Sequence, residues 1–230
     1  MQATYVQRIR LTFTKTGPTR FIGHLDLARA LERALNRAKI PMAYSQGFNR
    51  RIKMQLAAAL PLGFTSDCEL ADIWLIEQTS PEEVRERLMR KMAPGIEVIH
   101  VEEVPLRDPP LQTITSEASY AVTFLDPVNE SELQQRIEDL MASESCMRER
   151  ARRGKPRPYD LRPLIIELGV NRRPQGALQL HIRLALQQGK SGRPDEVLLA
   201  LGLDPLAARI NRTRILLSHF ETKGGPQDRD

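Results

Sequence analysis

The sequence predicts an α+β fold of two tandem ferredoxin-like halves, in which antiparallel sheets are backed by helices. Three observations support this prediction. Short runs alternate between polar and apolar residues, which is the period of a half-buried strand. Longer runs repeat apolar residues at helical spacing. The element order β-α-β-β-α-β occurs on both sides of the turn-rich stretch 107–110, and that order is typical of the split β-α-β arrangement.

The first half, residues 1–106, opens with alternating polar and apolar residues. Apolar residues then recur at helical spacing between His24 and Pro41, which predicts a helix that ends before the proline. Ser80 followed by Pro81 is a favourable start for a second helix, because serine caps the first turn and proline fits there. The expected elements are a strand at 8–13, a helix at 24–40, strands at 52–60 and 69–77, a helix at 81–93 and a strand at 96–104.

The second half, residues 115–222, repeats this order, and residues 223–230 are expected to form a flexible tail. A helix capped by Asn129 or Ser131 follows its first strand. Residues 146–160 contain a stretch too basic and too polar to bury, so an exposed loop is expected there. The other expected elements are strands at 120–124, 162–169 and 177–186, a short helix at 194–202 and a strand at 209–217.

Charge is distributed unevenly along the chain, whose net charge is +5 at pH 7. Residues 1–60 contain 11 Lys or Arg against 2 Asp or Glu, whereas residues 61–145 contain 6 against 18. If both blocks fold together, the molecule has a positive side and a negative side. A positive side attracts nucleic acid or another acidic partner. The alternative is a solvated surface of mixed charge.

Composition excludes several classes of site. Cys68 and Cys146 form no CxxC pair, so the chain alone lacks the ligands for a thiol-based zinc site or an iron–sulfur cluster. We therefore expect the chain to bind no metal and no cofactor of its own. Two scattered cysteines suit a reducing compartment, and no stretch approaches the roughly 18 apolar residues of a membrane helix. The expected location is the cytoplasm, without membrane contact.

Two segments of the basic block, 15–24 and 44–53, are candidate phosphate-binding loops. The first joins a strand to a helix start, where unpaired backbone N–H groups favour anions. The second combines cations, which bind phosphates, with aromatic rings, which stack on bases. The alternative is a pair of surface loops, with Phe48 in the core. The candidate RNA-contact residues here are Lys15, Arg20, His24, Arg29, Tyr44, Gln46, Phe48, Asn49, Arg50, Arg51 and Lys53.

The second half offers another candidate anion site in the glycine-rich stretch 189–194, directly before an expected helix. The stretch lacks the upstream glycine of a P-loop, so we expect no ATP site. The candidate contacts in this half are Lys190, Ser191, Arg193 and Arg212. His24 is the one histidine beside a basic loop and is a weak candidate for a general acid or base, although the sequence places no second base near it.

Two runs of sequence resemble the radical-SAM-linked family, a widespread bacterial domain of unassigned function. The first, at 13–63, reads FTKTGPTRFIGHLDLARALERALNRAKIPMAYSQGFNRRIKMQLAAALPLG, and the second, at 191–216, reads SGRPDEVLLALGLDPLAARINRTRIL. The family usually has Ser in place of Gly23 and Pro in place of Arg50. The first difference alters a helix cap, and the second adds a cation to the loop.

The resemblance implies a partner, since such proteins are fused to or encoded beside a radical SAM protein. That partner would hold the S-adenosylmethionine and the iron–sulfur cluster, because this chain has no CxxxCxxC motif. The implied role is an accessory RNA-binding module, without catalytic activity of its own, that presents tRNA or rRNA to the radical enzyme. The alternatives are a protein-interaction subunit that docks on that enzyme and a metal-independent RNase centred on His24.

Overall fold

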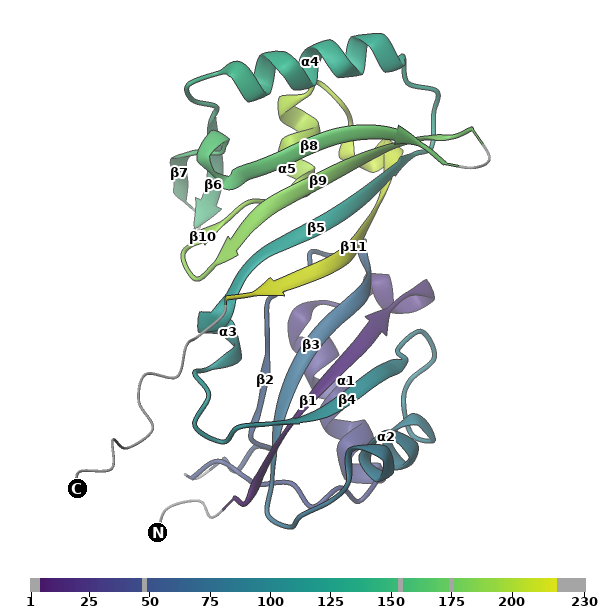
Figure 1. Ribbon diagram of the computed structural model, residues 1–230, viewed down its shortest axis with the longest axis vertical. Helices are drawn as coiled ribbons and strands as arrows, with labels where there is room; N and C mark the ends of the chain where they lie inside the picture. The colour runs from purple at the N-terminus through teal and green to yellow at the C-terminus, as the bar shows by residue number, and fades with distance from the viewer. Residues whose placement is uncertain (1–4, 47–48, 153–154, 174–175, 219–230) are drawn as a thin grey trace, which may run out of the picture.

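The computed structural model describes residues 5–46, 49–152, 155–173 and 176–218, in which nine strands form one large, mostly antiparallel sheet (Figure 1). The predicted mixture of helices and antiparallel strands is confirmed. The strands are β1 (Gln7–Lys15), β2 (Met54–Leu56), β3 (Thr65–Leu75), β4 (Val98–Val104), β5 (Thr115–Phe124), β6 (Met147–Arg152), β7 (Lys155–Asp160), β8 (Ile165–Arg172), β9 (Leu178–Gln187), β10 (Lys190–Ser191) and β11 (Ala208–Leu217). The helices are α1 (His24–Arg37), α2 (Pro81–Met89), α3 (Leu111–Ile114), α4 (Glu130–Ala142) and α5 (Pro194–Ala200).

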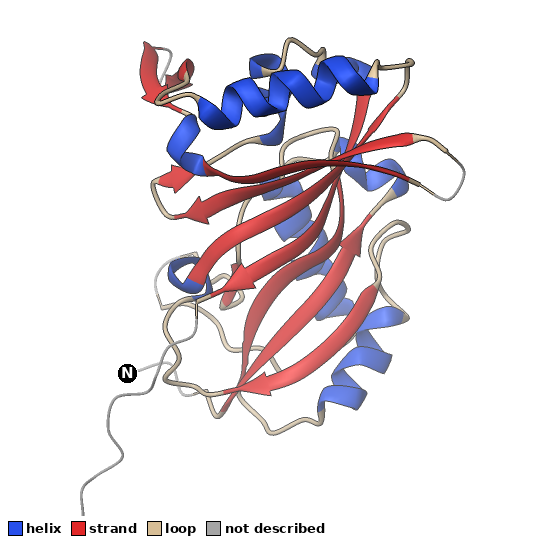
Figure 2. Ribbon diagram, turned by 45° about the horizontal axis from the view of Figure 1, so that its top comes forward, coloured by secondary structure: helices blue, strands red, loops and turns tan. Residues whose placement is uncertain are grey.

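The sheet runs in the order β10-β9-β5-β11-β3-β1-β4, with β2 paired to β3 and β8 paired to β9. Strands of the two predicted halves meet where β11 lies parallel to β3, and the paired residues there are Asn211 with Thr65 and Arg212 with Ser66. Helices α1 and α2 lie behind the strands of the first half, and α4 and α5 lie along those of the second (Figures 1 and 2). The two halves are therefore joined through one sheet by a short parallel contact, which we call the seam.

Buried hydrophobic residues form three clusters. One is built from the first half alone, under α1 and α2. A second belongs to the second half but also takes Leu60 and Phe64 from the first. A third, small cluster joins Ala57 to Leu111 and Ile114 of α3. The segment after β2 thus leaves its own half and packs against the other.

This crossing explains why β2 is only three residues long, whereas the sequence predicted a strand at 52–60. The expected exposed loop at 146–160 is also wrong in part, since β6 and β7 pair there as a separate two-stranded hairpin. The first long helix is confirmed, with α1 beginning at His24 as predicted. Ser80 caps α2 as expected, and its hydroxyl oxygen accepts a hydrogen bond from the Glu83 backbone N–H. No helix in the described part of the chain is both long and apolar enough to cross a membrane.

Two arginines of the basic first block are structural rather than free. Arg8 donates to Asp72 at 2.5 Å and Arg10 donates to the same carboxylate at 2.8 Å, and all three side chains are buried. Arg8 also donates to the backbone carbonyls of Asp108 and Pro109, which fixes the connection between the halves. The positive charge counted along this part of the sequence therefore overstates the charge that faces solvent.

Candidate anion-binding cleft

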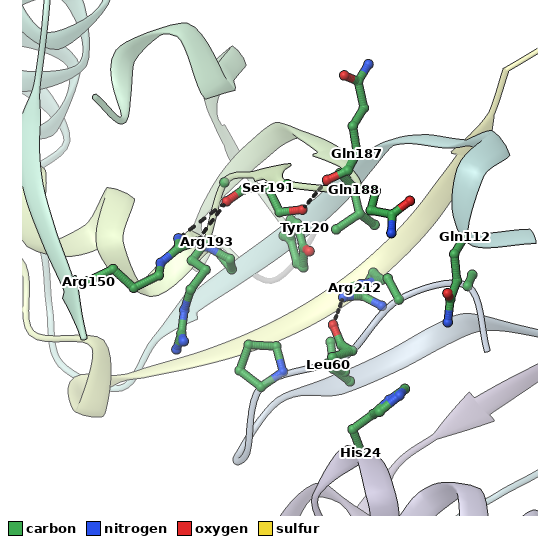
Figure 3. A pocket seen from close by; sticks show the side chains of 18 residues that line it. His24, Leu60, Gln112, Tyr120, Arg150, Gln187, Gln188, Ser191, Arg193 and Arg212 are labelled. Carbon is green, nitrogen blue, oxygen red and sulfur yellow. Dashed lines mark hydrogen bonds between the residues drawn. The ribbon is translucent and has the colours of Figure 1, made fainter. Parts of the chain in front are cut away.

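A cavity of about 420 Å³ lies between the two halves at the seam (Figure 3). In that view Arg150 and Ser191 lie on one side and His24 on the other, with Tyr120 and Arg212 between them. The described residues that line the cavity include no Asp or Glu. The lining consists of His24, residues 57–61, Gln112, Tyr120, Arg150, residues 186–189, residues 191–194 and Arg212.

A second cavity, of about 890 Å³, adjoins the first and shares Arg150, Gln187, Gly189 and Ser191 with it. Its own lining adds two cations, Arg157 and Lys190, together with Tyr159 and the carboxylate Asp160. That carboxylate accepts hydrogen bonds from the backbone N–H groups of Cys146 and Arg162. We call the two cavities together the cleft.

Arg150 lies where the two cavities meet. Its Nη1 and Nη2 atoms donate to the Ser191 carbonyl at 3.4 and 3.3 Å, and its guanidinium stacks 4.6 Å from the centre of the Tyr159 ring. Its Nε is buried without a hydrogen-bond partner, and no described carboxylate lies within 4 Å of its guanidinium. The side chain is thus held in position by a carbonyl and a ring while its charge stays unmatched.

Arg212 forms the inner wall of the cleft and is 1% exposed. It donates to Glu69 at 2.9 Å and to the Ala59 carbonyl at 2.9 Å, but its Nε has no partner among the described groups. Burial lowers the pKa of this guanidinium, yet the attraction of Glu69 and of Tyr120 outweighs burial and the net pKa is raised. Arg212 therefore stays charged and connects β11 to β3 across the seam.

Lys15 does not fit the predicted phosphate-binding role. Its side chain is buried, and its Nζ donates to the Phe64 carbonyl at 3.3 Å. Burial lowers the pKa of this amine, the nearby Arg212 lowers it further, and Glu69 opposes both. Without displacement of the residues that cover it, Lys15 cannot reach a ligand.

The two predicted basic loops lie at opposite ends of β1. Residues 16–23 follow the end of β1, whereas Tyr44 bridges Ile52 close to Trp74, which pairs with the start of β1. At about 3.3 Å per residue, the nine-residue strand separates these ends by about 26 Å. A single nucleotide cannot contact both loops. Of the predicted residues, His24, Ser191, Arg193 and Arg212 line the first cavity and Lys190 lines the second.

The other predicted residues lie outside the cleft lining. Arg20 stacks over Phe21, Arg29 pairs with Asp26, and Lys53 lies 3.6 Å from the centre of the Tyr5 ring. The Tyr44 hydroxyl donates to Asn36 near the start of β1, at the end of the first half that lies opposite to residues 16–23. Gln46, Asn49, Arg50 and Arg51 are exposed there, and Phe48 lies outside the described residues.

Sequence reasoning missed Arg150, Arg157 and the glutamines of the cleft as site residues. A signal was present, because residues 146–163 contain 7 Lys or Arg against 2 Asp or Glu. The fold of that stretch was not predictable from the sequence. It forms the β6–β7 hairpin, which places Arg150 against Ser191. Arg193, which was predicted, is partly neutralised, since it donates twice to Asp195 at 3.0 and 2.5 Å.

His24 lines the first cavity, and its Nδ1 is buried without a partner. General acid–base catalysis of RNA cleavage needs a second proton-transfer group placed near the first. The described lining residues offer arginines, amides and Tyr120 but no carboxylate and no other histidine. Nor do the described residues include a group of three or more His, Cys, Asp or Glu side chains that could hold a metal ion. The arrangement is suited to binding an anion.

Cys68, behind the seam, offers a chemical test of this packing. Burial raises the pKa of its thiol to about 11, and the charges of Glu69 and Asp67 add to the increase. Because the thiolate is the reactive form, we expect Cys68 in a Cys146→Ser variant to be alkylated far more slowly at about pH 8 than an ordinary thiol. Iodoacetamide labelling followed by mass spectrometry, repeated after unfolding in urea, measures this difference. Equal rates in the folded and unfolded protein would contradict it.

The model of a family described as "Uncharacterized protein conserved in bacteria (DUF2344)" matches residues 8–194. The chain belongs to this family. No curated protein matches it. The family description assigns no activity.

The solved structures that match this family member are only distantly similar to it. One is a Cbf5-Nop10-Gar1 complex, with 10% identity over 90% of this chain and 48% of that chain and a TM-score of 0.47. Another is the archaeal box H/ACA sRNP Nop10-Cbf5 complex, with 10% identity over 91% of this chain and 48% of that chain and a TM-score of 0.43. This chain spans about half the length of the chains it matches. At these values, no function is transferred from them.

Proposed function

We propose that the protein is an accessory RNA-binding module and that the cleft holds the RNA backbone. The observation that carries the proposal is Arg150, a positioned guanidinium with an unmatched charge at the junction of two cavities. Arginine presents a rigid fork of donors that matches phosphate oxygens, and stacking on a ring holds that fork in place.

The surrounding charges support a polyanion rather than a single small anion. Arg157 and Lys190 extend the positive surface along the second cavity, and neither has a described carboxylate within 4 Å. Arg193 and Arg212 add further positive charge, although each already has a carboxylate partner. A row of cations along a groove suits the regularly spaced phosphates of a nucleic acid.

The identity of the RNA and of the partner rests on the family resemblance alone. We propose that the RNA is tRNA or rRNA and that the module presents it to a radical SAM enzyme. That enzyme would carry the S-adenosylmethionine and the iron–sulfur cluster. We also propose that each half is a ferredoxin-like unit, which the orders β4-β1-β3-β2 and β11-β5-β9-β8 support.

A second candidate function, docking on a protein partner, is favoured by one exposed apolar patch. Phe21, Leu25 and Leu62 are each more than 60% exposed. The Gly63 N–H donates to the Arg20 carbonyl at 2.8 Å, which brings the segment around Leu62 beside Phe21. Exposed apolar side chains that lie together mark interaction surfaces in soluble proteins. This patch could contact a protein while the cleft holds RNA, so the two functions are compatible.

The first test is the salt dependence of RNA binding. Contact with four or five phosphates releases counterions and gives a slope of log K against log salt of about −3 to −4.5, since each contact contributes about −0.7 to −0.9. Fluorescence anisotropy with labelled tRNA at about 50 and 200 mM salt measures the slope. Absence of binding at the lower salt concentration would refute the proposed function. An RNA affinity that does not change with salt concentration would refute the role of the cations.

A further inference from the structure

The first cavity has less than half the volume of the second. Its volume of about 420 Å³ falls within the roughly 300–1,000 Å³ range of small-ligand pockets. Both halves of the protein contribute walls, so the space is bounded on opposite sides. A duplex keeps its bases stacked inside the helix and could place only its backbone at the rim. An unstacked nucleotide of a single strand could enter the first cavity.

The lining has the chemistry that a nucleotide requires. Arg150 at the boundary is positioned for a phosphate. The amides of Gln112, Gln187 and Gln188 can each donate and accept, which suits the mixed donors and acceptors of a base edge. Leu60 and Leu186 add apolar surface, against which a base can pack.

Several side chains that line this cavity have a buried polar atom without a hydrogen-bond partner. Four buried side-chain nitrogen or oxygen atoms in the described residues lack a hydrogen-bond partner. Three of them belong to residues that line this cavity, namely His24 Nδ1, Arg150 Nε and Arg212 Nε. Buried polar groups are normally satisfied. These three atoms are themselves covered, so a polar ligand in the cavity would meet the other nitrogen atoms of the same side chains.

We propose that this cavity receives one unstacked nucleotide of a single-stranded RNA segment, with its phosphate on Arg150 and the adjoining backbone along the second cavity. This inference rests on the proposed RNA-binding function and narrows the substrate to RNA with an unpaired segment. Proteins recognise such segments by splaying bases into pockets and contacting their edges. The duplex parts of a structured RNA then contribute only contacts outside the cavity.

The variant that tests it is Ala59→Phe. Ala59 lines the cavity with an exposed side chain, and only its backbone carbonyl bonds to Arg212. The larger ring fills space without removing a charge or a hydrogen bond. The matched control is Ala142→Phe, an exposed position at the end of α4 outside the cleft lining. Thermal unfolding verifies that both variants fold.

Anisotropy is measured with a labelled single strand of about 12 nucleotides and with a blunt duplex of the same length. We expect the wild type to bind the single strand at least about tenfold more tightly, because only the single strand can place a base in the cavity. Ala59→Phe should remove this preference and leave duplex binding unchanged, and Ala142→Phe should change neither affinity. Equal binding of both RNAs by the wild type, or a preference retained in Ala59→Phe, would overturn the inference while leaving the proposed function intact.

If Ala59→Phe does not fold, Gln188→Ala is the substitute, because Gln188 is exposed in the lining and its loss creates no clash. This variant should bind the single strand a few-fold more weakly and bind the duplex with unchanged affinity. Competition separates a nucleotide site from a simple anion site: adenosine 5′-monophosphate should displace the single strand at lower concentration than inorganic phosphate. Equal competition by phosphate would overturn the inference. Failure of wild type to bind any RNA would overturn the proposed function itself.

Discussion

The Glu69→Ala variant is expected to lose about 3–5 kcal/mol of its free energy of unfolding. Glu69 is the carboxylate that compensates Arg212, and both side chains are almost completely buried. Removal of one partner leaves a buried charge without compensation, which costs far more than loss of an exposed ion pair. The seam should weaken most, because Arg212 also holds the Ala59 carbonyl beside the cleft.

Urea unfolding followed by circular dichroism measures this loss. Glu86→Ala is the matched control. Glu86 forms an exposed ion pair, in which its Oε2 lies 3.7 Å from Nη2 of Arg90. Loss of this exposed pair should cost less than about 1 kcal/mol. A Glu69→Ala, Arg212→Met double variant should be more stable than Glu69→Ala alone, because it removes the uncompensated charge. A loss below about 1 kcal/mol for Glu69→Ala would show that the pair does not hold the seam.

The Arg150→Gln variant is expected to bind RNA about ten- to a hundredfold more weakly than the wild type. Hydrogen bonds to a charged group contribute about 1.5–3 kcal/mol each, and 1.4 kcal/mol corresponds to a tenfold change in affinity. The salt slope should also become shallower by about one phosphate contact. Arg150→Lys should bind with intermediate affinity, because lysine keeps the charge but loses the planar fork.

Anisotropy with labelled tRNA provides the measurement, and Arg90→Gln provides the control for charge. Arg90 is an exposed cation at the end of α2, so its substitution makes the same change in net charge away from the cleft. Its affinity should fall no more than about twofold, through the general field alone. Equal losses in Arg150→Gln and Arg90→Gln would assign RNA binding to net charge and not to the cleft.

Local patterns predicted the helices α1, α2, α4 and α5 and several strands well, whereas the short helix α3 was not predicted. Leucines at helical spacing and a following proline correctly placed α1, and the Ser80-Pro81 pair correctly placed the start of α2. The final strand was predicted at 209–217, and β11 begins one residue earlier, at Ala208. These features depend on residues close together in the sequence, and so they are visible in it.

Features that depend on distant residues were not visible. Arg8 and Arg10 are buried against Asp72, more than 60 residues away, which offsets one of their two charges, so the count of charges along the first 60 residues misplaced the positive surface. Arg212 meets Glu69 across 143 residues. The cleft likewise combines His24 with residues 186–193, which only the seam brings together.

The site prediction failed for Lys15 for the same physical reason. A lysine beside a Gly-Pro turn looks exposed when only its sequence neighbours are considered. Lys15 is nevertheless buried, and its Nζ donates to the carbonyl of Phe64, 49 residues further along the chain. Arg193 and Lys190 were found because their loop is short and rich in glycine, and such loops lie at the surface. Residues 44–46 and 49–53 remain a candidate second contact. They lie at the end of β1 opposite to residues 16–23, and the strand between these two ends is about 26 Å long.

Ultraviolet crosslinking of bound RNA, followed by mass spectrometry of the attached peptides, tests the location of the RNA site most directly. The RNA should be a structured tRNA with unpaired segments, bound at low salt. We expect the crosslinks to map to residues 186–193, to the neighbourhood of Arg150 and to His24, all of which surround the cleft. Crosslinks confined to residues 44–53 would contradict the cleft as the RNA-binding site.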